Sequence, residues 1–155
     1  MHHHAYLWTG PKARVDDEAL RRPPHPDPPP AGSRTELIDR YRQVAAEFRT
    51  SGLPPLETVY WLVKPRSLVR GTWEEAKEAA ARLGERLAEY APRCAAEHDG
   101  DTARLARLVD AAAERLCAGG DVPYGHYLER PSYLSLAVVT CSPHRTLSEL
   151  PCPRA

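Results

Sequence analysis

The sequence lacks net charge, a long apolar run and any diagnostic catalytic motif, and each absence excludes a class of protein. Its 155 residues include 21 basic and 21 acidic side chains, so the formal net charge is zero. A zero balance argues against a general affinity for nucleic acid or for a membrane surface. It also predicts weak repulsion between copies, which favours self-association or a permanent protein partner.

No apolar run is long enough to span a bilayer, and the start of the chain does not resemble a signal peptide. We therefore expect no membrane contact and a cytoplasmic location. In that compartment the cysteines should be thiols or metal ligands rather than disulfides; they are Cys94, Cys117, Cys141 and Cys152. The chain has no phosphate-binding loop, dinucleotide fingerprint or zinc-protease motif, so nothing names a reaction and the prediction leans away from an enzyme.

Proline is abundant, and its distribution divides the chain. We expect a proline-rich arm over 1–32, a helical domain over 33–145 and a C-terminal tail over 146–155. The stretch PPHPDPPP in the arm favours an extended, stiff polyproline conformation. Such a spacer would let Tyr6 and Trp8 at the tip dock on a groove of this chain or of a partner.

Three segments carry helical periodicity, and each follows a helix-start signal. Ser33 with Glu36 and Thr72 with Glu75 form capping-box pairs, and Asp101 is a cap for the third segment. Apolar residues then recur every three or four positions. Three amphipathic helices bury their apolar sides most simply against one another. The expected fold is therefore mainly α, with a three-helix bundle-like core.

Two further apolar segments, 56–63 and 132–140, fit either strands or helices. Their β-branched and aromatic residues favour strands, whereas their apolar spacing also fits helical faces. Because a lone strand has no partner for its backbone groups, we expect both to be short helices or both to form a minor two-stranded pairing. The prediction leans slightly to helices.

The most concrete chemical pattern joins Cys94 and His98, four positions apart, to Cys141 and His144, three positions apart. Four thiol and imidazole ligands suit tetrahedral zinc. The alternatives are a Cys141 nucleophile with His144 as its base, or no site, with Cys94 extending an apolar seam. The N-terminal histidines allow a separate copper or nickel site through His3, or an unstructured tail.

Basic residues cluster between two tryptophans: Lys64, Arg66 and Arg70 lie between Trp61 and Trp73 with no acidic residue among them. Guanidinium groups grip phosphate and indole rings stack on bases, so a phosphorylated ligand or nucleic acid could bind there. The alternative is a solvated loop whose tryptophans belong to the core. Taken together, the patterns favour a small non-enzymatic interaction or regulatory module over a zinc protein, a Cys/His enzyme or a phosphate binder.

Overall fold

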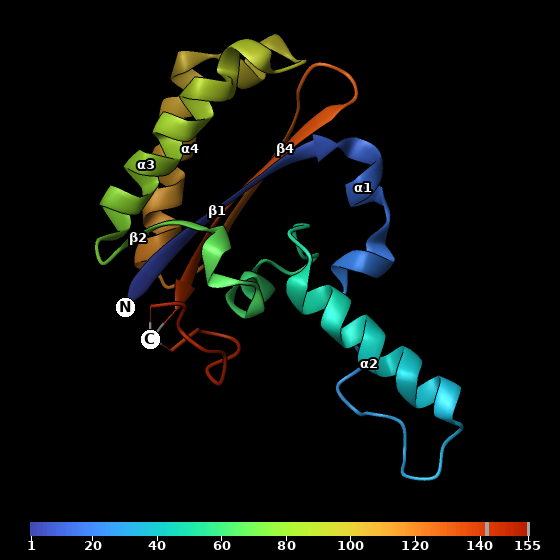
Figure 1. The fold of residues 1–155 in the computed structure, drawn as a ribbon. Helices are drawn as coiled ribbons and strands as arrows, with labels where there is room; N and C mark the ends of the chain where they lie inside the picture. Colours follow the sequence, from blue (N-terminus) through green and yellow to red (C-terminus); the bar gives the residue numbers. More distant parts are fainter. Residues whose placement is uncertain (142, 155) are drawn as a thin grey trace.

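The fold is built around a four-stranded antiparallel sheet, seen in a computed structural model that describes residues 1–141 and 143–154. The strands lie in the order β2-β1-β4-β3 (Figure 1). Their bounds are β1 (His2–Pro11), β2 (Val69–Trp73), β3 (Val122–Tyr127) and β4 (Ser132–Cys141). The expected mainly helical, three-helix bundle is therefore wrong, and the fold combines helices with a sheet.

Strands β1 and β4 form the centre of the sheet and pair along their whole length, from His2 opposite Cys141 to Pro11 opposite Ser132. Most of β4 is buried on both of its faces. A strand covered on both sides needs apolar residues at consecutive positions, so it loses the alternation that identifies a half-buried strand. This is why 132–140 was ambiguous in the sequence.

The prediction that 56–63 and 132–140 share one structure is also wrong. Residues 132–140 belong to β4, whose partners are β1 and β3. The other segment contains a 3-10 helix, η2 (Thr58–Val63), which packs against β4. The expected lone-strand problem does not arise, because the partner strand comes from the N-terminal segment.

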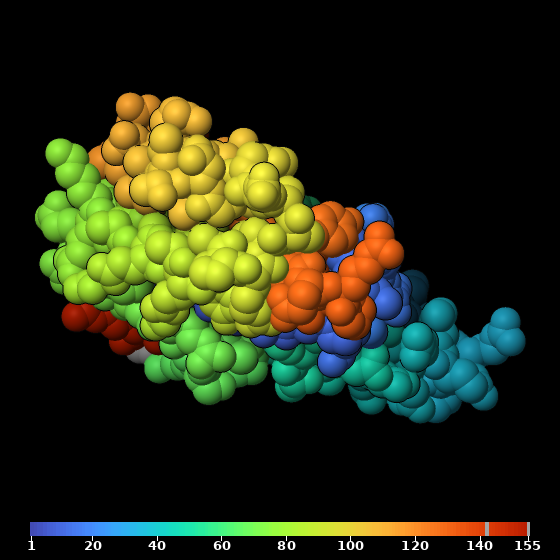
Figure 2. All heavy atoms as spheres, turned by 90° about the horizontal axis from the view of Figure 1, so that it is seen from above, coloured from blue at the N-terminus to red at the C-terminus, as the bar shows by residue number. Residues whose placement is uncertain are grey.

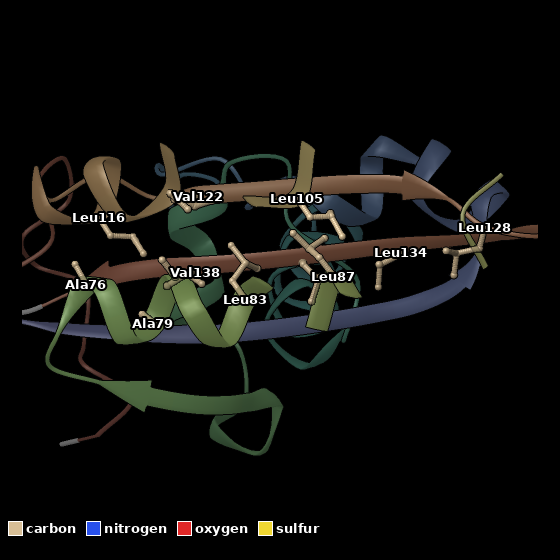
Figure 3. Close-up of a cluster of buried hydrophobic side chains, with 13 residues drawn as sticks. Ala76, Ala79, Leu83, Leu87, Leu105, Leu116, Val122, Leu128, Leu134 and Val138 are labelled. Atoms are coloured by element: carbon tan, nitrogen blue, oxygen red, sulfur yellow. The ribbon is translucent and has the colours of Figure 1, made fainter. Parts of the chain in front are cut away.

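Three long helices occur where the periodicity predicts them: α2 (Thr35–Thr50), α3 (Ala76–Tyr90) and α4 (Thr102–Cys117). Helices α3 and α4 pack on each other and on one face of the sheet (Figure 3). Their leucines meet β4 in one buried cluster, which includes Leu83, Leu87, Leu105, Leu116, Leu134 and Val138. The apolar stripes of α3 and α4 are thus covered by the sheet instead of by a third helix.

Helix α2 stands apart from this core and extends from one end of the molecule (Figures 1 and 2). Near its start Leu37 is 55% exposed, whereas Phe48 near its end is buried. Phe48 packs edge-on against Tyr60 of η2. Only the C-terminal end of α2 therefore joins the body, and its periodicity does not make it a bundle member.

The helix starts differ from one another in how they are capped. The side chain of Asp101 accepts a hydrogen bond from the backbone N–H of Arg104, which confirms it as the cap of α4. Ser33 instead donates to the carbonyl of Pro30, and Thr72 lies within β2. The two capping boxes therefore do not form, since both residues are engaged elsewhere.

The second face of the sheet carries its own apolar cluster, centred on Tyr6. Its ring stacks on that of Trp61, with centroids 4.7 Å apart, and it packs with Val59, Leu62 and Val139. Residues 2–11, expected as the tip of an arm, thus occupy a central strand. A short helix, α1 (Lys12–Asp16), and a 3-10 turn, η1 (Glu18–Arg21), lead from β1 to the proline-rich segment.

Candidate metal centre

The candidate site begins with the alternation of side chains along β1. Side chains on a strand point to opposite faces in turn, so His2, His4 and Tyr6 share one face. His2 lies directly opposite Cys141 in the antiparallel register, and opposed residues project to the same side of a sheet. Two histidines and a cysteine therefore meet at one end of the β1–β4 pair.

Cys152 completes the group from the C-terminal segment, which returns beside the start of β1 (Figure 1). Its sulfur lies 3.3 Å from Cys141 Sγ, 3.5 Å from His4 Nε2 and 3.6 Å from His2 Nδ1. His4 Nε2 is 2.9 Å from Cys141 Sγ. The four donor atoms lie within 4.8 Å of one another, close enough to hold a metal ion.

These separations are close to those of a tetrahedral site. With Zn–S bonds of about 2.3 Å and Zn–N bonds of about 2.0–2.1 Å, tetrahedral geometry puts the donor atoms about 3.3–3.8 Å apart. The sulfur–sulfur distance of 3.3 Å is far longer than the roughly 2.05 Å of a disulfide, and both cysteines are free thiols. The 2.9 Å nitrogen–sulfur contact and the 3.3 Å sulfur–sulfur contact are both tighter than this geometry requires.

His4 is held in place by β2 as well as by its own strand. Its Nδ1 lies 2.8 Å from Thr72 Oγ1, and the two residues face each other in the β1–β2 register. A histidine that ligates a metal through one nitrogen is commonly oriented by a hydrogen bond at the other. Thr72 can therefore fix the ring so that Nε2 points at the two sulfurs.

Burial sets the protonation of His4 and Cys141. Burial lowers the pKa of His4 to about 4, with His2 and His3 adding a smaller effect of the same sign. Burial also raises the pKa of Cys141 to about 12, and its hydrogen bond with Cys152 adds to this. The imidazole therefore has a free lone pair, and the thiol holds its proton unless a cation is nearby. A dication reverses that preference and makes the thiolate the stable form.

One further polar atom belongs to the same face. The Tyr6 hydroxyl is buried and has no hydrogen-bond partner among the described residues. Burial raises the pKa of Tyr6, and the nearby thiols of Cys141 and Cys152 raise it further. The phenol therefore stays a donor without an acceptor, on the face where metal-bound thiolates would supply negative charge.

Of the four ligands predicted from sequence, only Cys141 belongs to this group. Cys94 follows α3 at the far end of the helix layer, and its sulfur donates to the carbonyl of Tyr90 at 3.6 Å. His98 lies in a 3-10 turn, η5 (Glu97–Gly100), 3.4 Å from a carboxylate oxygen of Asp99. The structure therefore does not bring Cys94 and His98 to Cys141.

His144 is buried near the end of β4 but faces a different partner. Its Nε2 lies 2.9 Å from a carboxylate oxygen of Asp121, and its Nδ1 accepts hydrogen bonds from the backbone N–H groups of Thr146 and Leu147. Both ring nitrogens are thus engaged, so neither is placed to take a proton from the Cys141 thiol. His126 of β3 also lies outside this group, and its Nδ1 is 3.6 Å from a carboxylate oxygen of Asp99.

The predicted basic cluster is divided between two places. Trp61 is 3% exposed and stacks within the core, so its ring offers no face to a base. Lys64 and Arg66 line one pocket, whereas Arg70 and Trp73 line another between β2 and α3. Of the aromatic pair assigned to partner binding, Tyr6 is buried and Trp8 packs over Gly10.

Sequence reasoning missed His2, His4 and Cys152. The available signal was the H-x-H spacing, which puts two imidazoles on one face if the segment is a strand. By itself the histidine run resembles a tail, and the N-terminal position of His3 points to that residue as the metal ligand. In the structure His3 points to the opposite face, with its Nδ1 2.9 Å from Thr140 Oγ1.

Comparison of the chain with protein-family models, with curated proteins and with solved structures gives no match. A search of the described helices finds none with the length and apolar character of a membrane span. Within residues 1–141 and 143–154, no second group of three or more His, Cys, Asp or Glu side chains is close enough to share a metal ion. This group is therefore the feature of the described residues from which a function can be inferred.

Proposed function

We propose that this is a zinc-binding protein in which His2, His4, Cys141 and Cys152 hold one metal ion. The observation that carries the proposal is the convergence of four thiol and imidazole donor atoms within 4.8 Å. The set combines two soft thiol ligands with two imidazoles, which is the donor chemistry of tetrahedral zinc. The hydrogen bond between His4 Nδ1 and Thr72 Oγ1 supports the same assignment, because a Nδ1–H that donates to the hydroxyl leaves Nε2 free to bind the metal.

The role that this ligand set favours is structural. Four protein ligands complete a tetrahedron and leave no position for a water or substrate, unlike the open site of a catalytic zinc. The ion would join the start of β1, the end of β4 and the C-terminal segment. The start of β1 is 137 to 150 positions away from the other two parts in the chain. The metal would therefore close the fold where its two ends meet.

The experiment is a metal analysis of protein prepared without a histidine tag. We expect about one zinc per chain in the wild type and a loss of most of it in Cys141→Ser and in His4→Gln. Cobalt substitution adds a spectroscopic test, because a tetrahedral site with thiolates gives intense visible bands and a charge-transfer band that each Cys→Ser change removes.

Matched control variants are available on the same chain. Cys117→Ser removes an exposed thiol of α4, and His25→Gln removes an exposed imidazole of the proline-rich segment. Both should keep full zinc content and the cobalt spectrum. Substoichiometric metal in the wild type, or an equal loss in control and site variants, would contradict the proposal.

We propose further that the metal-held scaffold acts as a non-enzymatic interaction or regulatory module. The closed ligand set supports the absence of chemistry at the metal, and the zero net charge supports association with another protein or with itself. Light scattering coupled to size-exclusion chromatography tests self-association. A measured mass of two or more times 17.3 kDa supports it. A monomer at all concentrations would rule out self-association and leave association with a different protein.

A further inference from the structure

A pocket of about 300 Å³ lies beside the metal centre, between the end of α2, the η2–η3 region and the C-terminal segment. Arg49 comes from α2, Lys64 follows η2, and Arg66 begins a second 3-10 turn, η3 (Arg66–Leu68). The segment 150–153, which includes Cys152, forms the remaining wall of the pocket. Its volume is at the lower end of the range typical of small-ligand sites, roughly 300–1,000 Å³.

The charged side chains that line this pocket are all positive. Its lining includes three cationic side chains and no carboxylate. None of these cations forms an ion pair with any residue in the described part of the chain. This differs from the arginines of α3, where Arg82 and Arg86 each pair with a glutamate three positions on. Three like charges without a counter-charge attract an anion into the space between them.

Lys64 is the component that distinguishes the pocket from a solvated surface patch. It is 5% exposed, its Nζ donates to the carbonyl of Phe48, and that nitrogen lies 4.1 Å from the centre of the Phe48 ring. An ammonium group has three donors, and the carbonyl takes one. The side chain is thus already ordered, with donors left for a ligand and little rotamer entropy still to lose on binding.

We propose that Arg49, Lys64 and Arg66 form a binding site for the phosphate group of a small ligand. A phosphate is favoured over a carboxylate because it carries more charge and more acceptor oxygens, which suits two guanidinium forks and an ammonium. Single-stranded nucleic acid is disfavoured, since Trp61, the predicted stacking residue nearest the site, is buried. All three cations lie outside the metal ligand set, and Cys152 is the one proposed zinc ligand in the pocket wall.

The experiment measures binding of inorganic phosphate and of pyrophosphate by the full chain, using phosphorus NMR line broadening and calorimetry at constant ionic strength. We expect saturable binding by the wild type, with chloride as a non-binding reference. Arg49→Gln and Arg66→Gln change exposed side chains and should fold normally. Each should weaken binding about tenfold, the effect of losing one charge-assisted hydrogen bond.

Arg42→Gln is the matched control, because Arg42 is exposed on the same helix as Arg49 but outside the pocket. It should bind phosphate like the wild type. No saturable binding in the millimolar range would overturn the proposal, as would equal weakening by Arg42→Gln and the two pocket variants. Tighter binding of a DNA oligonucleotide than of pyrophosphate, lost in the pocket variants, would also overturn it in favour of nucleic acid. Zinc content measured on the same samples keeps this outcome separate from that of the metal proposal.

Discussion

Chelation of zinc should lower the melting temperature of the wild-type protein by about 5–10 °C and leave that of Cys152→Ser unchanged. A ligand that binds only the folded state at 100 times its dissociation constant adds about 2.7 kcal/mol of stability. In a chain of this size each kcal/mol shifts the melting temperature by about 2–4 °C. Multiplying this stability gain by the shift per kcal/mol gives the expected change of about 5–10 °C in melting temperature.

The loop that the metal would close gives a scale for comparison. The metal would join His4 to Cys141, which are 137 positions apart. A permanent cross-link over that span would add about 5 kcal/mol by restricting the unfolded chain. Zinc that binds only the folded chain adds instead a free energy set by its concentration relative to its dissociation constant, which the loop length does not limit.

The assay is differential scanning calorimetry with zinc in excess and with a strong chelator. Cys152→Ser is the informative variant, because Cys152 is only partly buried and lies outside the strands, so the metal-free fold should survive its change. Cys117→Ser should keep the full shift. The reasoning is refuted if the wild type melts at one temperature under both conditions, or if Cys152→Ser shows the same shift.

Three further predictions test the core, a buried charge and the thiols. Leu83→Ala, in the core, should cost about 2–5 kcal/mol in urea unfolding, whereas Leu37→Ala on the exposed part of α2 should stay within about 0.5 kcal/mol; equal costs would favour a helical bundle. Burial lowers the pKa of Lys64 to about 8, so the unfolded state binds more protons between pH 8 and the usual lysine pKa. Wild-type stability relative to Lys64→Met should therefore rise with pH over that window, by at most about 3 kcal/mol, and a flat difference in chemical denaturation would contradict it. Hydrogen peroxide should oxidise the metal-free Cys141 and Cys152 thiols to a disulfide, while zinc protects them. Each disulfide consumes one peroxide, forms two waters and removes two hydrogens from the protein mass. Oxidation at equal rates with and without zinc would count against their shared site.

The long helices could be predicted from the sequence because their signals are local. Apolar spacing of three and four residues places α2, α3 and α4 close to their actual bounds. The Asp101 cap is local too, since it acts on a residue three positions away. The same spacing could not show that α2 extends from the body while α3 and α4 are covered, because this depends on which surfaces meet.

The sheet was not predictable in this way, because its signals are either weak or shared between distant segments. Strand β4 is buried on both faces and so lacks a period of two. Strand β1 begins with three histidines, which resemble a tail until pairing with β2 and β4 makes the segment a central strand. Thr72 has the spacing of a helix cap in the sequence, but its hydroxyl forms a hydrogen bond with His4 Nδ1 across the β1–β2 pair.

What the sequence by itself determined is therefore the set of helices and the presence of thiol and imidazole groups suited to a metal. Only the tertiary structure decided which of them meet. Cys141 was predicted as a ligand, but its neighbours His2, His4 and Cys152 were not, since the antiparallel β1–β4 register and the returning C-terminal segment bring them together. The two histidines and the two cysteines lie 137 or more positions apart, so no single spacing in the sequence joins all four ligands, because their geometry belongs to the sheet.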